Sequence, residues 1–111
     1  MKMPFNSVKE IFDGMPRAFD PGAAPGLNAV IQFNIDGDEG GDWYATIRDQ
    51  TCTVSKGVYD NPTLSIRMKD KDWVALCKGE LNGVMAFMTG KLKAKGDIML
   101  AQRMPKLFSM G

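Results

Sequence analysis

The spacing of the hydrophobic residues changes twice along this chain of 111 residues. Between Val8 and Phe19 the apolar residues recur at intervals of three and four, which is typical of one face of a helix. From Leu27 to Ile35 they recur at every second position, as in a strand with one buried face. The helical spacing returns after Asp70. This order of patterns predicts a domain of the α+β class, in which helices pack on a sheet.

The first helix is predicted to begin at Ser7. Ser7 and Glu10 have the spacing of a capping box, in which the hydroxyl and the carboxylate each accept a hydrogen bond from a free backbone N–H group. Pro16 lies inside the apolar stripe of this helix, so we expect the helix to break near that residue. Residues 20–26 are rich in Gly and Pro and are predicted to form a loop.

Four strands are predicted between residues 27 and 68. Short connections rich in Gly, Asp, Asn and Pro separate them, which favours an antiparallel meander with one buried face. The apolar residues that define the strands are Leu27, Ala29, Ile31, Phe33 and Ile35, then Trp43, Ala45 and Ile47, then Cys52 and Val54, and lastly Leu64, Ile66 and Met68.

Two short helices are predicted after the fourth strand. The first should be capped by Asp70 or Asp72 and should stop near Gly79. The second covers residues 84–88 and is apolar nearly all round. It is therefore expected to be buried on several sides.

A fifth strand and a final helix complete the predicted fold. In the strand, residues 91–95, Leu92 and Ala94 alternate with three lysines. Asp97 should cap the final helix, and Pro105 should kink or split it. The whole chain, residues 1–111, is thus predicted to form one domain with a five-stranded, mostly antiparallel sheet whose helices cover one face.

The composition argues against several classes of function. The chain has no histidine, so it has no Ser-His or Cys-His pair for covalent catalysis, and its two cysteines lack the spacing of a zinc site. Carboxylates cluster between residues 36 and 42, but Ile47 stands where a calcium loop needs glutamate. A net charge of +1 argues against nucleic-acid binding. We therefore predict a non-enzymatic protein with no catalytic residue, no metal and no cofactor.

The longest apolar runs are residues 73–77 and 84–88, far shorter than the roughly 20 residues that cross a bilayer. The first residues lack the apolar segment of a signal peptide. Without export signals, Cys52 and Cys77 are interpreted as reduced, buried thiols. These features predict a cytoplasmic location.

Methionines and cations gather in the last third of the chain. Flexible methionine side chains suit variable apolar partners, although ordinary core packing explains any single one as well. A row of cations could attract an anionic headgroup or membrane surface, or could simply be the solvated face of an edge strand. The methionines concerned are Met85, Met88, Met99, Met104 and Met110, and the cations are Lys91, Lys93, Lys95, Arg103 and Lys106.

The stretch from residue 79 to residue 101 resembles the sterol carrier protein type 2 family. Within it, residues 86–97 match the run Ala-Phe-x-x-Gly-Lys-Leu-Lys-x-x-Gly-Asp. The resemblance extends over nearly the whole chain through upstream matches at Ile11-Phe12, Met15-Pro16, Phe19, Gln32-Phe33, Trp43, Gly57, Pro62 and Asp72. It implies a five-stranded sheet whose helices enclose a hydrophobic tunnel. It also implies binding of fatty acids, fatty acyl-CoA, sterols or other lipids without cofactor or metal.

Eukaryotic members of that family end in a peroxisomal tripeptide of the Ser-Lys-Leu kind, whereas this sequence ends Ser109-Met110-Gly111. We therefore expect a bacterial or archaeal member, for which sterol itself is a doubtful ligand.

A lipid cavity is predicted among the apolar residues of the helices and the sheet. Arg103 and Lys106 are the candidate headgroup ligands. The segment beyond Pro105 is predicted to close the cavity as a gate, because it is apolar and lies near the chain end. The predicted lining residues are Phe33, Ile35, Trp73, Leu76, Met85, Phe87, Met88, Leu100, Met104, Leu107 and Phe108.

Two other hypotheses stay open at this point. The chain could be an accessory protein that presents a lipid or isoprenoid intermediate to a biosynthetic complex, or an enzyme that processes acyl-CoA through Cys77. Transient contact with a membrane surface is compatible with each of them. The sequence makes no prediction of the oligomeric state.

Overall fold

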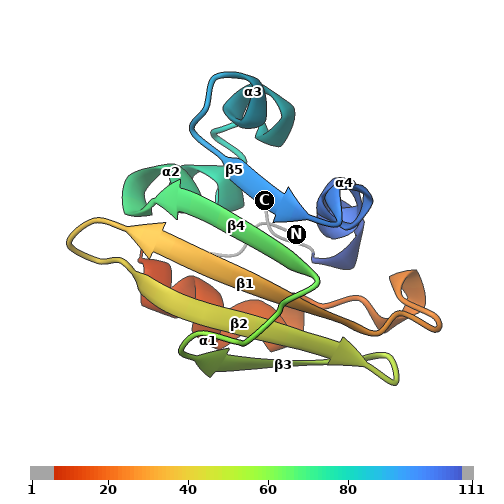
Figure 1. Cartoon of the computed structure of the whole chain (residues 1–111). Helices are drawn as coiled ribbons and strands as arrows, with labels where there is room; N and C mark the ends of the chain where they lie inside the picture. The colour runs from red at the N-terminus through yellow and green to blue at the C-terminus, as the bar shows by residue number, and fades with distance from the viewer. Residues whose placement is uncertain (1–6, 109–111) are drawn as a thin grey trace.

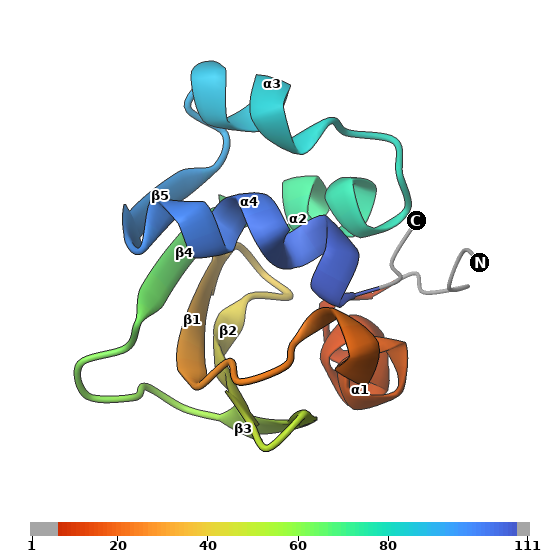
Figure 2. The ribbon, with the colours of Figure 1, turned by 90° about the vertical axis from the view of Figure 1, so that its right-hand side faces the viewer.

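The computed structural model describes residues 7–108, which form a five-stranded sheet covered by helices (Figure 1). Figure 2 shows the sheet nearly edge-on, with α1, α2 and α4 on one side of it. This arrangement confirms the predicted α+β class. In chain order the elements are α1 (Val8–Ala18), the 3-10 turn η1 (Pro21–Ala23), β1 (Ala29–Asp36), β2 (Gly41–Arg48), β3 (Thr51–Lys56), β4 (Leu64–Lys69), α2 (Asp70–Cys77), α3 (Gly83–Met88), β5 (Lys93–Gly96) and α4 (Ile98–Leu107).

The strands lie in the order β3-β2-β1-β4-β5. Three of the four pairings are antiparallel, as predicted, but β1 and β4 are parallel. The predicted four-strand meander is therefore wrong at its last step, because β4 pairs with β1 instead of β3. That pairing places Ile66 beside Phe33, and both side chains are buried. The sheet thus joins the most apolar strands at its centre.

The connection between β3 and β4 crosses the face of the sheet opposite the helices (Figure 1). Gln32 of β1 holds it there: its Nε2 donates to the Gly57 carbonyl (3.1 Å), and its Oε1 accepts from the Tyr59 N–H (2.8 Å). The Gln32 side chain is buried and fully engaged in these bonds. This crossover lets β4 reach the free edge of β1.

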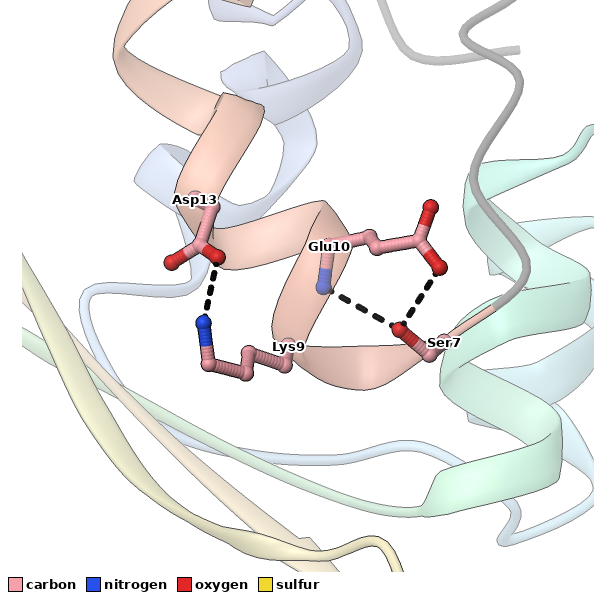
Figure 3. A network of polar contacts seen from close by, with 4 residues as sticks. All are labelled: Ser7, Lys9, Glu10 and Asp13. Atoms are coloured by element: carbon pink, nitrogen blue, oxygen red, sulfur yellow. Dashed lines mark hydrogen bonds and ion pairs between the residues drawn. The ribbon is translucent and has the colours of Figure 1, made fainter.

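Ser7 caps α1, and only half of the predicted capping box forms (Figure 3). The Glu10 N–H donates to Ser7 Oγ at 3.2 Å, as predicted. The Glu10 carboxylate, however, accepts from the Ser7 hydroxyl at 3.1 Å. Lys9 and Asp13, one turn apart on α1, form an ion pair of 2.8 Å. This pair is exposed and therefore contributes little stability.

Pro16 and Pro105 lie inside continuous helices, so the predicted break near Pro16 and a split at Pro105 are wrong, whereas a kink at Pro105 stays a prediction. α1 runs through Pro16 to Ala18, and α4 runs through Pro105 to Leu107. A proline in a helix interior costs about 3 kcal/mol. Buried residues on the far side of each proline, Ala18 and Leu107, hold the last turn against the core. Tertiary packing therefore outweighs the local preference.

The start of α2 differs from the prediction, whereas its end agrees with it. Lys69 is the N-cap residue and makes no side-chain cap, so neither Asp70 nor Asp72 caps the helix. The Asp70 carboxylate accepts from the neighbouring Lys71 N–H at 2.8 Å and from the Glu39 N–H at 3.1 Å, and the second bond ties α2 to the β1–β2 turn. Gly79 has φ +79° just after the helix, a conformation that glycine adopts without strain.

An aromatic cluster forms the core beneath α1. The Phe12 ring stacks on Trp43 and Trp73 with centroid distances of 4.5 and 5.4 Å, and it meets Phe33 edge-on at 5.3 Å. These four residues come from α1, β1, β2 and α2, so the cluster joins four elements. This half of the sheet is consequently filled with side chains.

α3 is the element whose environment was predicted least well. It was expected to be buried on several sides, but Ala86 is its buried side chain, while Val84 and Met88 are 69% and 74% exposed. Figure 2 shows α3 standing away from the sheet, beyond α2 and α4. Within residues 7–108, no helix is long and apolar enough to cross a membrane.

Candidate functional site

An apolar cavity of about 480 Å³ lies between α2, α3, α4 and the β4–β5 edge of the sheet. It falls within the size range of roughly 300–1,000 Å³ that is usual for small-molecule sites. The residues that line it are Ile66, Trp73, Leu76, Cys77, Gly79, Leu81, Gly83, Val84, Phe87, Leu92, Ala94, Ile98, Ala101, Gln102, Met104, Pro105 and Phe108.

Among residues 7–108, no charged side chain lies in the wall of this cavity. Gln102 supplies its one amide side chain, and Cys77 its one titratable group. Two other hollows, each of about 450 Å³, have Lys, Asp or Glu side chains in their walls. The chemistry of the apolar cavity suits a hydrocarbon and offers no acid–base pair for catalysis.

Small side chains account for the empty space. Ile66 and Ala94 are paired across β4 and β5 and form the sheet side of the cavity. Ala101 faces it from α4, and Gly83 lies at the start of α3. A large residue at Ala94, Ala101 or Gly83 would fill part of the volume. The aromatic core ends where these small residues begin.

The structure brings together five of the predicted lining residues, namely Trp73, Leu76, Phe87, Met104 and Phe108. The other six do not line the cavity. Four of them, Phe33, Ile35, Leu100 and Leu107, are buried in the core, and Met85 and Met88 are exposed on α3.

A periodic apolar stripe marks a helix face, but it does not tell core residues from cavity residues. Leu100 and Met104, one turn apart on α4, illustrate this, because Leu100 packs in the core and Met104 borders the cavity. About half of the lining residues that the sequence analysis did not assign to the cavity are small or polar. Ile66, Leu92 and Ala94 had been recognised as apolar positions of strands, but nothing in the pattern distinguished them as cavity residues.

The two candidate headgroup residues lie outside the cavity wall. Arg103 and Lys106 are both exposed. The Arg103 guanidinium donates through Nη2 to the Ala23 carbonyl at 3.3 Å. It therefore ties α4 to the turn after α1.

The segment predicted to act as a gate at the end of α4 is packed in place, with Phe108 in the cavity wall, and its opening stays a prediction. Leu107 and Phe108 are 0% and 2% exposed. The Asp20 N–H donates to the Leu107 carbonyl at 2.8 Å, and the Phe108 ring lies 5.7 Å from the ring of Phe19. These contacts anchor the segment in the core. Met110, which was placed in the same gate, lies outside the described residues.

Among the described residues, Trp73 has the one buried polar side-chain atom without a hydrogen-bond partner. Its side chain is 2% exposed, and its Nε1–H has no hydrogen-bond partner. Leaving such a donor unpaired costs about 1–3 kcal/mol. The indole ring also lines the cavity, so its fluorescence should report on the cavity contents.

Burial raises the pKa of the Cys77 thiol to about 12 and that of Cys52 to about 11. The thiolate, which is the reactive form, is therefore scarce at neutral pH. This disfavours Cys77 as the nucleophile of an acyl-CoA-processing enzyme. Within residues 7–108 there is also no group of three or more His, Cys, Asp or Glu side chains that could hold a metal ion.

We expect both thiols to resist Ellman's reagent near neutral pH in the folded protein and to react fully after unfolding. The folded pKa of Cys77 lies above its ordinary value of 9.0, so its contribution to stability is present below about pH 9 and is lost between about pH 9 and pH 12. A Cys77→Ala variant should lose less stability over that interval, measured by urea unfolding. Rapid labelling of the folded protein would contradict the burial of these thiols.

Comparison with known proteins assigns the chain to a family. The profile of the SCP-2 sterol transfer family matches residues 8–109. Hydroxysteroid dehydrogenase-like protein 2 of Rattus norvegicus is 33% identical over 109 residues, which cover 97% of this chain and 21% of the relative. This chain thus spans about a fifth of the length of that protein. The relative is a mammalian protein, and the expected bacterial or archaeal origin stays a prediction.

Solved structures show the same fold. The solution structure of palmitated SCP2L2 from Aedes aegypti is 26% identical, with a TM-score of 0.75, over 91% of this chain and 93% of that one. Sterol Carrier Protein 2 from Yarrowia lipolytica, in its apo form, is 24% identical, with a TM-score of 0.74, over 96% and 94% of the two chains. By sequence profile and by fold, this chain belongs to the SCP-2 sterol transfer family.

Proposed function

We propose that the protein is a non-enzymatic carrier that holds the hydrocarbon part of a lipid in the cavity between α2, α3, α4 and the β4–β5 edge. The observation that carries this proposal is an apolar cavity of about 480 Å³ in whose wall the described part of the chain places no charged side chain. The lipid would be a fatty acid, a fatty acyl-CoA, a sterol-like molecule or an isoprenoid. We further propose that the protein acts in the cytoplasm.

The energetics of such a site favour binding without strong selectivity. Burying one methylene group is worth about 0.8 kcal/mol, so a long acyl chain gains on the order of 10 kcal/mol before the costs of association. Loss of ligand freedom offsets much of that gain. An apolar wall distinguishes ligands by little more than their length and shape. A carrier needs this combination, and the palmitated state of the Aedes aegypti relative supports a fatty acyl ligand.

Filling the cavity tests the proposal. Ala101 lines the cavity, so an Ala101→Trp variant should occupy the space that the ligand needs. We expect its affinity for a fluorescent fatty acid to fall at least tenfold, or about 1.4 kcal/mol. The matched control is Val58→Trp, because Val58 is 72% exposed and lies in the β3–β4 crossover on the opposite face of the sheet.

Circular dichroism should show that both variants are folded, so that any loss of affinity can be assigned to the cavity. Unchanged affinity in a folded Ala101→Trp protein would contradict ligand binding at this place. If the parent protein also binds no fatty acid, fatty acyl-CoA, sterol or isoprenoid, the carrier proposal itself fails.

A second candidate function is suggested by the length of the relatives. Because the matching region is only 21% of the rat hydroxysteroid dehydrogenase-like protein 2, the remainder of that protein is linked to it covalently. The present chain could serve an enzyme in the same way, by presenting a lipid to a separate protein. Reproducible co-purification of one lipid-metabolising enzyme from the native host would favour this candidate over a free carrier.

A further inference from the structure

Two polar side chains of α2 are buried at the lipid cavity. Trp73 and Cys77 lie one turn apart on this helix, and both line the cavity. They are 2% and 5% exposed. Residues at this spacing share one face of a helix, with Cβ atoms about 5–6 Å apart. The α2 side of an otherwise apolar wall therefore holds a buried indole N–H and a buried thiol.

The indole N–H of Trp73 lacks an acceptor in the described part of the chain. The indole ring packs against the rings of Phe12 and Phe33, at centroid distances of 5.4 and 5.2 Å. Neither of these side chains has an oxygen or nitrogen atom that could accept a hydrogen bond. Because the indole ring also borders the cavity, a molecule held there is the neighbour that can supply an acceptor.

Both buried groups are hydrogen-bond donors near neutral pH. An indole N–H can donate but cannot accept. Burial raises the pKa of the Cys77 thiol to about 12, so the thiol keeps its proton and is a weak donor. Gln102 also lines the cavity, but it is exposed and can bond to water. A ligand oxygen placed next to α2 would therefore pair the donor that the protein leaves unpaired.

The oxygen that fits this position is a neutral one. Among residues 7–108, the cavity wall has no cation that could pair with a carboxylate. Burying an unpaired carboxylate costs far more free energy than burying a ketone or a hydroxyl group. We therefore expect the acid group of a fatty acid to stay near solvent. The oxygen that meets Trp73 would belong to the hydrocarbon part of the lipid.

We propose that the Trp73 Nε1–H recognises lipids that carry a ketone or hydroxyl oxygen within their hydrocarbon part. The inference rests on the proposed carrier function and names the ligand class of the same cavity. The indole N–H is paired when the oxygen of such a lipid lies next to it, and it stays unpaired when an unsubstituted chain binds. Sites that hydrogen-bond a ligand oxygen discriminate against ligands that lack it, because the buried donor then has no partner. Trp73 thus adds a chemical preference to a cavity that otherwise selects by length and shape.

The test compares stearic acid with a series of ketostearic acids that carry the carbonyl at different carbons. Each is titrated against the whole protein by displacement of a fluorescent fatty acid. The ketostearic acids share one composition, so we expect one carbonyl position to bind about fivefold or more tightly than the others, where the oxygen meets the N–H.

A Trp73→Phe variant keeps an aromatic ring, removes the N–H and should lose this positional preference while still binding stearic acid. Trp43→Phe is the matched control, because Trp43 is buried in the same aromatic cluster but does not line the cavity. It should keep the preference, and circular dichroism should show that both variants are folded.

Nuclear magnetic resonance tests the same hydrogen bond without altering Trp73. The chain has two tryptophans, so the Trp43→Phe protein shows the indole N–H signal of Trp73 alone. A hydrogen bond deshields this proton, and the preferred ketostearic acid should move its signal further downfield than stearic acid does.

The inference is overturned if the parent protein shows no positional preference, if folded Trp73→Phe keeps that preference, or if the two ligands move the signal equally. Each of these results leaves the carrier function standing as long as stearic acid binds. Failure of stearic acid and of every ketostearic acid to bind would reject a fatty-acid carrier and this inference together.

Discussion

Replacing Phe12 with alanine is expected to lower the free energy of unfolding by about 3–5 kcal/mol. The Phe12 side chain is 1% exposed and contacts the rings of Phe33, Trp43 and Trp73. Removing it leaves a cavity at the point where α1, α2 and the first two strands meet. A domain of this size is stable by about 5–15 kcal/mol in total, so this one substitution should remove a large part of the margin.

Urea unfolding followed by circular dichroism measures this loss without relying on tryptophan emission, which the substitution itself would disturb. Val58→Ala is the control, since Val58 is exposed and surface substitutions change stability by about 0.5 kcal/mol or less. A loss below about 1 kcal/mol for Phe12→Ala would mean that the aromatic cluster is not the main core.

The strands were predictable from the sequence because alternation is a local signal. Ile31 and Phe33, two residues apart, face the same side of β1 and are buried as predicted. The pairing partner of β4 was not predictable in this way. It depends on the crossover that Gln32 holds through hydrogen bonds to Gly57 and Tyr59, and these contacts join residues 25 and 27 positions apart. Short-range patterns carry no information about such contacts.

The environment of α3 shows a second limit of sequence patterns. Its apolar composition indicated burial, yet Val84 and Phe87 are exposed where they line the cavity, and Met88 is exposed outside it. An apolar residue lowers its free energy equally by packing in a core, on a ligand or on a partner, and the sequence does not tell these apart. For the same reason the predicted site mixed Leu100, a core residue, with Met104, a cavity residue.

Small residues gave the weakest signal of the site. The side chains of Ala94 and Ala101 are short and so leave space in the cavity, whereas a hydrophobic pattern is defined by large apolar side chains. The family resemblance supplied the expectation of a cavity, and the structure then located it between particular elements.

Deleting residues 107–111 is expected to abolish the cooperative fold, and not merely to weaken lipid binding. The deletion removes Leu107 and Phe108, which are buried, together with the hydrogen bond between the Asp20 N–H and the Leu107 carbonyl. Truncation of each large buried side chain typically costs about 2–5 kcal/mol, so the two together approach the whole stability of the domain. Phe19 would also lose its aromatic partner.

The measurement is thermal unfolding by circular dichroism, with Lys106→Ala as the matched control because Lys106 is the exposed neighbour of this segment. The control should unfold like the parent protein, and the truncated chain should show no cooperative transition. A truncated protein that unfolds cooperatively but binds fatty acid at least tenfold more weakly would restore the gate that the sequence suggested. The geometry favours the core assignment, because a gate must open at low cost. Leu107 and Phe108 are 0% and 2% exposed, so moving this segment away from the domain would expose their apolar surface to water.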